Sequence, residues 1–301
     1  MDKTQTLEER LTDFKSSIKY KVDRHEGLSI DENGLSETLE QFACDLPLLM
    51  EEIEKQGARS IWLKIPISKS SYIETAAKQG LVFHHTVDDF LMMNKWVEKG
   101  TDNKLPGFAT HYIGVGGMVL NDSDEILLIQ ENRYVDNKPF WKLPGGLVEN
   151  NEDLEEAVLR EVKEETGVTA TVTGVLGFRE VKNFMFGKND MYFVFLMHAD
   201  KNETEINIQE DEIAQCEWVP CKDFAEKAPI LSPLLQKIAP IFNAGNETPE
   251  KVLEQYRKEN SKEDMLKIMS LTNKKYDFRN RTNNMYLSKF IKDCMRLGSK
   301  L

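Results

Sequence analysis

The chain has 301 residues, enough for one large domain or two ordinary ones, and either can bury a core without disulfides or a structural metal. The segment after Gly245 has 13 Lys and Arg against 8 Asp and Glu, a net +5, so the rest carries −17 within a total of −12; this acidic body disfavours nucleic acid as a partner. No apolar run approaches the roughly 20 residues that span a bilayer, and the N-terminal sequence lacks signal-peptide and transit-peptide features, so we expect no membrane association and a cytoplasmic, or else nuclear, location.

The first region reads as a small α/β domain. Helical spacing of apolar residues predicts a helix over residues 36–56, which Pro47 should kink or split. Alternation predicts a strand over residues 60–67, and a helix over 70–79 should end at Gly80. Two more strands follow in LVFHH and FLMMNKWV, and we therefore place a first domain at residues 15–98.

Histidine and cysteine give no metal-binding pattern. His84 and His85 are adjacent on a predicted strand, so we expect their side chains to lie on opposite faces and to have structural roles. The four cysteines are scattered without a CxxC pair, which favours reduced thiols over disulfides or a zinc site; they are Cys44, Cys216, Cys221 and Cys294.

Residues 99–110 collect turn formers and charge and are typical of a linker. The second domain is placed at residues 111–244. Its predicted strands are HYIGVGGMVLN and EILLIQE, joined as a hairpin, then TVTGVLGFREVK, NDMYFVFLMHA and CEWVP. Helices are predicted after Asn151 and over residues 231–242, so this part is expected to be mixed α and β around one sheet.

The C-terminal tail, residues 245–301, is rich in Lys and Asn and poor in strand formers. Its low hydrophobicity favours a surface-packed or partly disordered segment, in which stretches such as EKVLEQYRKEN can be helical. A basic arm that binds a partner is the alternative.

The segment GGLVENNEDLEEAVLREVKEETGV, residues 145–168, carries the clearest chemical pattern. On a helix Glu161, Glu164 and Glu165 stand at i, i+3 and i+4, so their carboxylates should crowd together within about 5 to 6 Å. The apolar stripe that would anchor this helix to the sheet is Leu154, Val158 and Val162.

Such crowding is unfavourable unless a cation neutralises it, and Mg²⁺ or Mn²⁺ prefers carboxylate oxygens. The alternative is an ordinary amphipathic helix with a solvated acidic face. Arg160 should be kept away from the metal, and Glu152 is placed to pair with it and lock the preceding loop onto the helix. Pro144, Gly145 and Gly146 allow a turn in which a backbone carbonyl points at the cation, and Gly167 should end the helix.

The order Gly146, Glu152, Arg160-Glu161, Glu164-Glu165, Gly167 at these spacings resembles the Nudix box of the Nudix hydrolases at every defining position. SIWLKIPI, GLVFHH, FLMMNKWV, FWKLPGG, GFRE and FGKNDMYFV are similar to a subfamily with a pre-Nudix domain, which includes plant ADP-ribose and NADH pyrophosphatases and an animal protein encoded antisense to basic fibroblast growth factor. The resemblance covers residues 15–240. It implies an α+β fold, a Nudix α/β/α sandwich with a mixed sheet, preceded by a small acetyltransferase-like domain. That domain lacks the glycine-rich loop for coenzyme A, so acyl transfer is not expected.

The resemblance also implies roles for individual residues. Glu161, Glu164 and Glu165 would bind Mg²⁺ or Mn²⁺ with the Gly146 carbonyl, and Arg160 and Glu152 would orient them. The implied reaction is attack of a metal-bound water on one phosphorus of a diphosphate, releasing a nucleoside monophosphate. The residue that takes the proton varies within the family; Glu165 is the first candidate, followed by Glu212 and Glu180.

Substrate contacts lie outside the box. Lys142 and Arg179 can reach phosphate oxygens, or they are plain surface charges. Phe184 and Phe186 can stack on a base with Lys188 nearby, or the turn that holds them merely buries its aromatic rings.

The leading hypothesis is a pyrophosphatase that releases AMP from ADP-ribose or NADH, a nucleotide small-molecule substrate. A second hypothesis keeps the chemistry but takes dinucleoside polyphosphates, coenzyme A or capped RNA, although the acidic body counts against long RNA. The third is a regulatory nucleotide-binding protein without turnover, which would have no reason to keep three repelling carboxylates. A homodimer is possible by resemblance.

Overall fold

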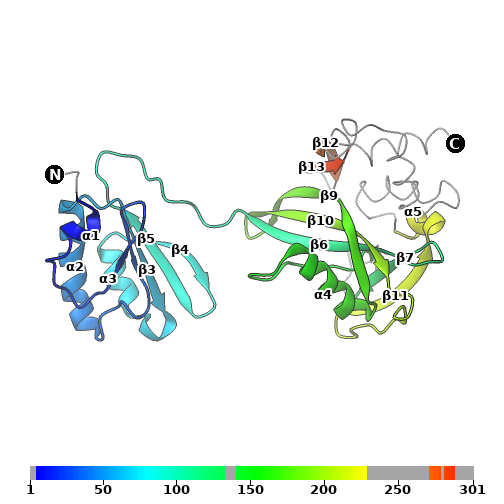
Figure 1. Ribbon diagram of the computed structural model, residues 1–301, viewed down its shortest axis with the longest axis horizontal. Coiled ribbons are helices and arrows are strands. Elements are labelled where there is room, and N and C mark those ends of the chain that lie inside the picture. The colour runs from blue at the N-terminus through cyan, green and yellow to red at the C-terminus, as the bar shows by residue number, and fades with distance from the viewer. Residues whose placement is uncertain (1–4, 133–139, 229–270, 279–280, 289–301) are drawn as a thin grey trace. The chain divides into compact units, whose positions relative to one another are not determined.

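The computed structural model describes residues 5–132, 140–228, 271–278 and 281–288. The chain divides into two compact units, Met1–Ala109 and Thr110–Leu301 (Figure 1). Each unit has its own hydrophobic core. Among the helices of the described residues, none combines the length and the apolar character needed to cross a membrane.

The first unit is a five-stranded sheet with helices. Its elements are α1 (Leu7–Arg10), β1 (Lys21–Val22), β2 (Gly27–Ile30), α2 (Leu39–Lys55), β3 (Ser60–Pro66), the 3-10 helix η1 (Ile67–Lys69), α3 (Tyr72–Lys78), β4 (Val82–Val87) and β5 (Phe90–Trp96). The strand order is β1-β2-β3-β5-β4, with β2 and β3 parallel and the other neighbours antiparallel. The predicted helices and strands of this region are thereby confirmed.

The core of this unit follows the sequence patterns. In β3 alternate residues Ile61, Leu63 and Ile65 are buried, as expected for a strand with one covered face. α2 continues through Pro47 as a single helix. Leu7 of α1 is also buried in this core, so the compact unit includes residues ahead of position 15, where we expected the domain to begin.

The expectation that His84 and His85 lie on opposite faces of their strand is wrong. The pairing of β4 with β5 shifts by one residue between Phe83 and His85, so His84 is the extra residue of a β-bulge. The two Nδ1 atoms are 2.5 Å apart, the His85 ring stacks on Phe108 at 5.1 Å, and His84 Nε2 lies 2.9 Å from the Pro106 carbonyl oxygen. Of the cysteines in the described residues, the free ones are Cys44, Cys216 and Cys221.

The second unit is built on one mixed sheet. Its elements are β6 (His111–Leu120), β7 (Glu125–Glu131), β8 (Trp141–Lys142), α4 (Leu154–Thr166), β9 (Ala170–Met185), β10 (Lys188–Ala199), β11 (Ile213–Pro220), the 3-10 helix η2 (Cys221–Asp223), α5 (Phe224–Lys227), β12 (Leu271–Phe278) and β13 (Arg281–Ser288). The strand order is β11-β7-β6-β10-β9-β13-β12, and β8 pairs with β7. β6 and β10 are parallel, and the other pairs are antiparallel.

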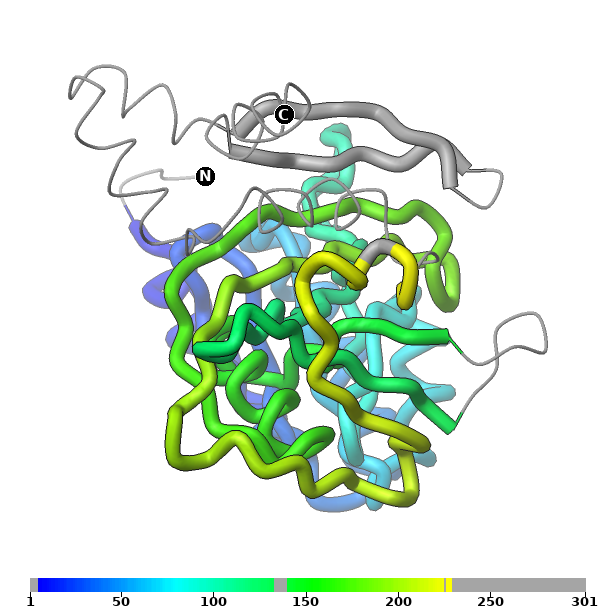
Figure 2. Tube along the Cα trace, turned by 90° about the vertical axis from the view of Figure 1, so that its right-hand side faces the viewer, coloured from blue at the N-terminus to red at the C-terminus, as the bar shows by residue number. Residues whose placement is uncertain are grey.

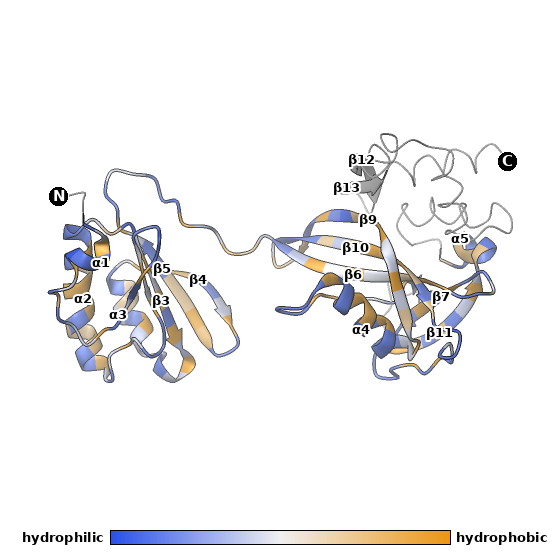
Figure 3. Cartoon of the chain, in the orientation of Figure 1, coloured by the Kyte–Doolittle hydropathy of each residue, from blue (hydrophilic) through white to orange (hydrophobic). Residues whose placement is uncertain are grey.

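Two hydrophobic clusters cover the two faces of this sheet. Val119 of β6 packs with Val158 and Val162 of α4, whereas Met118 packs with Phe224 of α5. Figure 3 shows hydrophobic residues along the central strands and residues of both kinds along α4, as expected for a helix with one covered face. The predicted α+β class, with helices against a mixed sheet, is confirmed, and the helix predicted over 231–242 lies outside the described residues.

The C-terminal tail contains strands that we did not expect. β12 and β13 form an antiparallel pair, and β13 also pairs with the outer side of β9, placing Asn284 opposite Glu180 and Leu287 opposite Gly177. The backbone of β9 therefore gains a partner strand although the tail is poor in strand formers, because sheet pairing uses backbone groups that every residue except proline has.

Candidate active site on the acidic helix

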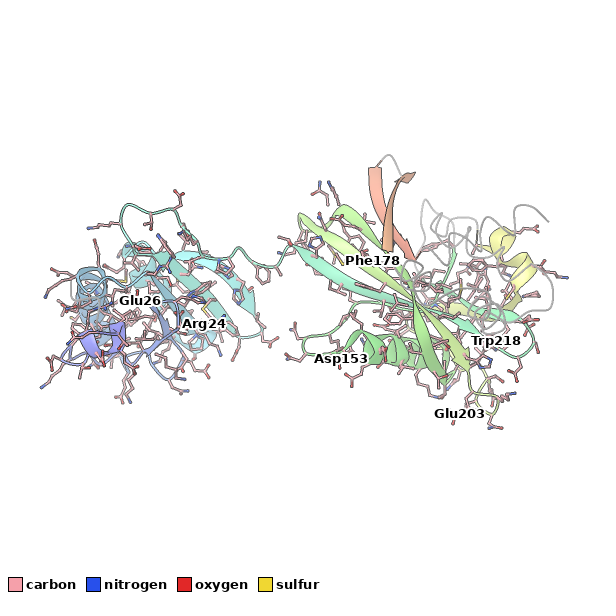
Figure 4. The ribbon with its side chains drawn as sticks, turned by 45° about the horizontal axis from the view of Figure 1, so that its top comes forward. Arg24, Glu26, Asp153, Phe178, Glu203 and Trp218 are labelled. Atoms are coloured by element: carbon pink, nitrogen blue, oxygen red, sulfur yellow. The ribbon has the colours of Figure 1, made fainter. Side chains whose placement is uncertain are left out.

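Local sequence signals fix both ends of α4. Asp153, labelled in Figure 4, is the N-cap, and its backbone amide lies 3.4 Å from the Glu156 carboxylate in a capping box. Gly167 ends the helix with a φ of 75°, in the left-handed region that favours glycine. Val158 and Val162 are buried against the sheet, so the helix has little freedom to rotate and its acidic residues have fixed directions.

Arg160 ties this helix to the loop before it. Its Nε and Nη2 atoms lie 2.7 and 3.0 Å from the two carboxylate oxygens of Glu152, and Nη2 also donates to the Leu147 carbonyl at 3.2 Å. The hydrogen bonds from Arg160 hold the pKa of Glu152 down to about 2. The ion pair expected between these two residues is therefore present, and it joins the loop to the helix.

Arg160 also contacts two of the three helix carboxylates, which differs from our expectation. Nη1 donates to Glu161 at 3.0 Å and to Glu164 at 3.1 Å, so the guanidinium is not held apart from the acidic residues. The repulsion that we expected a metal to relieve is relieved here for two carboxylates by a neighbouring arginine. The crowding of three glutamates on one helix therefore does not by itself require a metal ion.

Glu165 has other surroundings. Its side chain is buried, with 3% of the residue exposed, and one carboxylate oxygen accepts a 2.6 Å hydrogen bond from the Gly145 amide. Burial raises the pKa of Glu165 to about 7, because desolvation outweighs the stabilisation by Lys142 and by the Gly145 amide. A buried carboxyl with such a pKa is a common feature of functional sites.

Three carboxylates from separate parts of the chain meet at this point. Glu131 at the end of β7, Glu165 of α4 and Glu212 in the loop before β11 have oxygen atoms within 4.8 Å of one another, and we call them the acidic group. Within the part of the chain that the structure describes, this is the group of three or more potential ligands that gathers most closely. The connection that carries Glu212, yellow-green in Figure 2, is fixed to the end of α4 by a 2.8 Å bond from the Asn207 amide to the Thr166 carbonyl.

The backbone carbonyls of Gly145 and Gly146, beside the acidic group, have different partners. The Gly146 oxygen accepts a 2.9 Å hydrogen bond from the Val115 amide, and its role as a metal ligand stays a prediction. The Gly145 oxygen accepts a 3.1 Å hydrogen bond from the Lys142 ammonium. Gly145 has a φ of 146° and a Cβ there would lie 2.1 Å from the Val115 oxygen, so only glycine fits this turn.

Lys142 lies among the oxygens of the site. Its Nζ is 2.5 Å from a Glu131 oxygen and 3.7 Å from a Glu165 oxygen, in addition to the contact with Gly145. Burial by itself would lower the pKa of Lys142, but Glu165, Tyr192 and Glu131 together raise it. The ammonium is therefore engaged inside the protein and is not the plain surface charge of our alternative.

Arg179 and Asp190 form a second charged pair, on the neighbouring strands β9 and β10. Arg179 of β9 has an Nη2 atom 3.9 Å from Asp190 of β10, and its guanidinium lies 4.9 Å from the ring centroid of Tyr192. Asp190 is buried, and desolvation raises its pKa although Arg179 and His111 oppose the shift. The Nε atom of Arg179 is buried without a hydrogen-bond partner. This arginine therefore has donor capacity left for an anion.

Glu180, the third candidate for the proton acceptor, does not join the acidic group. Its carboxylate lies 3.2 Å from Asn189 Nδ2 and 3.4 Å from His111 Nε2. On β9 it stands opposite Met191 of β10, and the three carboxylates that gather within 4.8 Å are those of Glu131, Glu165 and Glu212. The structure thus separates Glu180 from the other two candidates, Glu165 and Glu212.

The aromatic residues proposed for base stacking lie at the tip of the β9–β10 hairpin. The register pairs Met185 with Lys188, leaving Phe186 and Gly187 as a two-residue turn with positive φ at both positions, as in a type I′ turn. Phe184 is 48% exposed and Phe186 is 85% exposed. The alternative that this turn buries its aromatic rings is therefore wrong.

Sequence reasoning missed Glu131, Asp190 and Tyr192. The sequence contained a signal for the first two. Glu131 is the last residue of the strand segment EILLIQE, and Asp190 directly precedes the apolar run MYFVFLM. Each is therefore an acidic residue next to an apolar strand segment. No local pattern connects either residue with the acidic helix, because the contacts depend on the strand order.

Two family models match the chain. The NUDIX domain model matches residues 110–238, and the model described as Nudix hydrolase domain matches residues 18–97. The first match covers the unit with the acidic group, and the second covers the strands and helices of the first unit.

Curated relatives match more than half of the chain. The chain is 38% identical over 170 residues to Nudix hydrolase 2 of Arabidopsis thaliana, covering 56% of this chain and 60% of that protein. It is 34% identical over 207 residues to human nucleoside diphosphate-linked moiety X motif 6, covering 68% and 64%, and 34% identical over 193 residues to Arabidopsis Nudix hydrolase 6, covering 63% and 67%. The chain spans about 60% of the length of several curated relatives that it matches. By these matches along both units, this chain belongs to the Nudix hydrolase family.

Proposed function

We propose that this protein hydrolyses the diphosphate linkage of a nucleoside diphosphate joined to another group, using Mg²⁺ or Mn²⁺. The observation that carries the proposal is the buried carboxyl of Glu165, on the helix that bears the family's box. Carboxylate oxygens of Glu165, Glu131 and Glu212 lie within 4.8 Å of one another. A binding protein without turnover would gain nothing from burying a carboxyl whose pKa is raised to about 7.

The donors at this point suit a hard divalent cation. Glu131, Glu165, Glu212 and the Gly145 carbonyl supply oxygen only, and Glu161 and Glu164 supply further carboxylates on the same helix. We propose that these residues hold the ion. When bound, a divalent ion lowers the pKa of a water molecule and stabilises charge that develops on phosphate oxygens.

The other residues position the reactants. Glu212 is exposed and stands beside the buried Glu165, so we assign it the acceptance of a proton from the attacking water. Arg179, held next to Asp190 and Tyr192, is the phosphate ligand. The ion pair of Arg160 and Glu152 holds the loop against the helix.

For the substrate we propose ADP-ribose or NADH, cleaved with release of AMP. The resemblance to the subfamily with a pre-Nudix domain supports this choice, as does the name of the human relative, which refers to nucleoside diphosphate-linked compounds. The exposed Phe184 and Phe186 would stack on the base, with Lys188 of the same hairpin on the phosphates. A homodimer and a cytoplasmic location stay predictions.

The first experiment tests Glu165. Glu165→Gln keeps the size of the side chain and can still accept from the Gly145 amide, but it removes the charge. We expect kcat to fall roughly 10²- to 10⁴-fold in a discontinuous assay of AMP release with Mg²⁺. Glu155→Gln, the same substitution at an exposed position of α4, is the matched control and should retain activity.

The second experiment separates the substrate alternatives. Purified protein is incubated with ADP-ribose, NADH, dinucleoside polyphosphates, coenzyme A and capped RNA, and nucleoside monophosphate is quantified. Release of AMP from ADP-ribose or NADH at the highest kcat/KM supports the proposal. Tight binding of one compound without hydrolysis of any would instead favour the nucleotide-binding regulatory protein.

A further inference from the structure

We propose that Lys142 is an internal cation of the acidic group, which binds the same oxygens as the divalent ion and is displaced when that ion enters. The inference rests on the proposed function insofar as the acidic group is taken to bind the metal. It assigns to Lys142 a role different from the direct phosphate contact that we expected from the sequence.

The contacts of the Lys142 ammonium are all with oxygen. A Glu131 carboxylate oxygen lies at 2.5 Å, the Gly145 carbonyl oxygen at 3.1 Å and a Glu165 carboxylate oxygen at 3.7 Å. Carboxylate and carbonyl oxygens in this number are the donors that Mg²⁺ and Mn²⁺ take. The ammonium thus sits at a position from which it contacts three ligands of the proposed metal site at once.

The burial of these partners explains why a cation is needed. The Glu165 side chain is 4% exposed and that of Glu131 is 21% exposed, and the Lys142 side chain between them is 19% exposed. A buried carboxylate and a half-buried one next to each other repel when both are ionised, and water can stabilise the buried one only poorly. Lys142 therefore keeps the acidic group assembled when no divalent ion is bound.

Lys142 and a divalent ion cannot use these oxygens together. An ammonium has three donors and no lone pair, so it cannot act as a metal ligand, and two cations sharing the same carboxylates repel strongly at low exposure. The lysine side chain is a flexible four-carbon stem, so the ammonium can swing away while the backbone of β8 stays in place. The displaced ammonium is then free for an anion such as a substrate phosphate.

The first test measures metal affinity without any substrate. Mn²⁺ binding to the full chain is followed by electron paramagnetic resonance, which reports free Mn²⁺. Lys142→Met removes the competing cation, and we expect its Kd for Mn²⁺ to fall at least about tenfold, which corresponds to about 1.4 kcal/mol. Lys163→Met is the matched control, because Lys163 lies on α4 but pairs with Glu203 and Thr169 at its exposed end; its Kd should equal that of the wild type.

Unchanged or weaker Mn²⁺ binding by Lys142→Met, with wild-type binding intact, would overturn this inference and leave the proposed function standing. Failure of both proteins to bind Mn²⁺ would overturn both. Circular dichroism checks that the variant is folded, and the second test does not depend on the variant.

The second test follows Lys142 in the wild-type protein. The full chain is acylated briefly with an amine-reactive reagent in EDTA or in saturating Mn²⁺, and the peptide with Lys142 is quantified by mass spectrometry. Displacement predicts that Mn²⁺ increases the labelling of Lys142 several-fold, whereas the labelling of Lys163 stays the same. Equal or lower labelling of Lys142 in Mn²⁺ would show that the ammonium keeps its carboxylate partners, and the inference would fail.

Discussion

The box segment, residues 145–168, and the β9–β10 hairpin both supply proposed site residues, but the two regions hold them in opposite ways. Glu165 is buried and hydrogen-bonded, and Arg160 has partners on the helix and on the preceding loop. Phe186, in contrast, is 85% exposed in a two-residue turn. The box residues are thus held by several contacts each, whereas the ring proposed for base recognition lies exposed at a hairpin tip.

The largest effect is expected when the contacts of Arg160 are removed, because this would loosen the box segment. Arg160→Met would leave Glu152, Glu161 and Glu164 without their shared cation and would untie the loop at Leu147. We expect a loss of about 2 kcal/mol in the free energy of unfolding, measured with urea, because the pairs are partly buried. Activity should fall by about 10- to 100-fold. Stability within 0.5 kcal/mol of wild type would show that the box segment is not held by this arginine.

The pair of Arg179 and Asp190 combines the two situations, since it lies on the hairpin strands but Asp190 is buried and Arg179 is half-buried. Asp190→Asn removes the charge that positions the guanidinium, so we expect KM to rise about tenfold with kcat little changed. Arg179→Lys should have a similar effect, and the double variant should be no worse than the single ones if both act through one contact. If the effects of the two substitutions on KM were additive, Asp190 would not act by positioning Arg179.

Stability as a function of pH distinguishes two glutamates within the box segment. The pKa of Glu152 is about 2 in the folded protein against 4.5 as the ordinary value, so its contribution is present above pH 4.5 and is lost as the pH falls toward 2. The pKa of Glu165 is raised to about 7, so its contribution is present below pH 4.5 and is lost as the pH rises to 7.

The measurement is urea denaturation in EDTA between pH 2.5 and 8. Glu152→Gln should flatten the loss of stability on the acid side of the profile, whereas Glu165→Gln should flatten the loss of stability between pH 4.5 and 7. Identical slopes in both variants would contradict the opposite surroundings that the two carboxyl groups have in the fold.

The smallest effect is expected at the hairpin tip. Phe186→Ala should raise KM for ADP-ribose about three- to tenfold without changing kcat or stability, because the ring has few contacts with the rest of the protein and stacking on a base is worth roughly 1 kcal/mol. Phe83→Ala, which also removes an exposed phenylalanine but lies in the first unit, is the control. A loss of stability in Phe186→Ala would mean that the ring has a structural role.

The local features of this protein could be predicted from its amino-acid sequence. The acid spacing, the buried positions Val158 and Val162 and the terminal Gly167 place α4 within two residues of its observed bounds. The Glu152–Arg160 pair was also predictable, because both residues belong to one helix and the turn before it. These features depend on helical geometry over a few residues, which the order of residues fixes directly.

The distant groups that complete the site are brought together by strand pairing and could not be predicted from local sequence. Glu131 and Glu212 reach Glu165 because β11 pairs with β7, and Asp190 lies beside Arg179 through the register of β10 on β9. The bulge at His84 and the pairing of β13 with β9 were likewise invisible in the sequence. Strand order and register are set by the packing of the whole sheet rather than by neighbouring residues, so no local pattern could reveal these contacts.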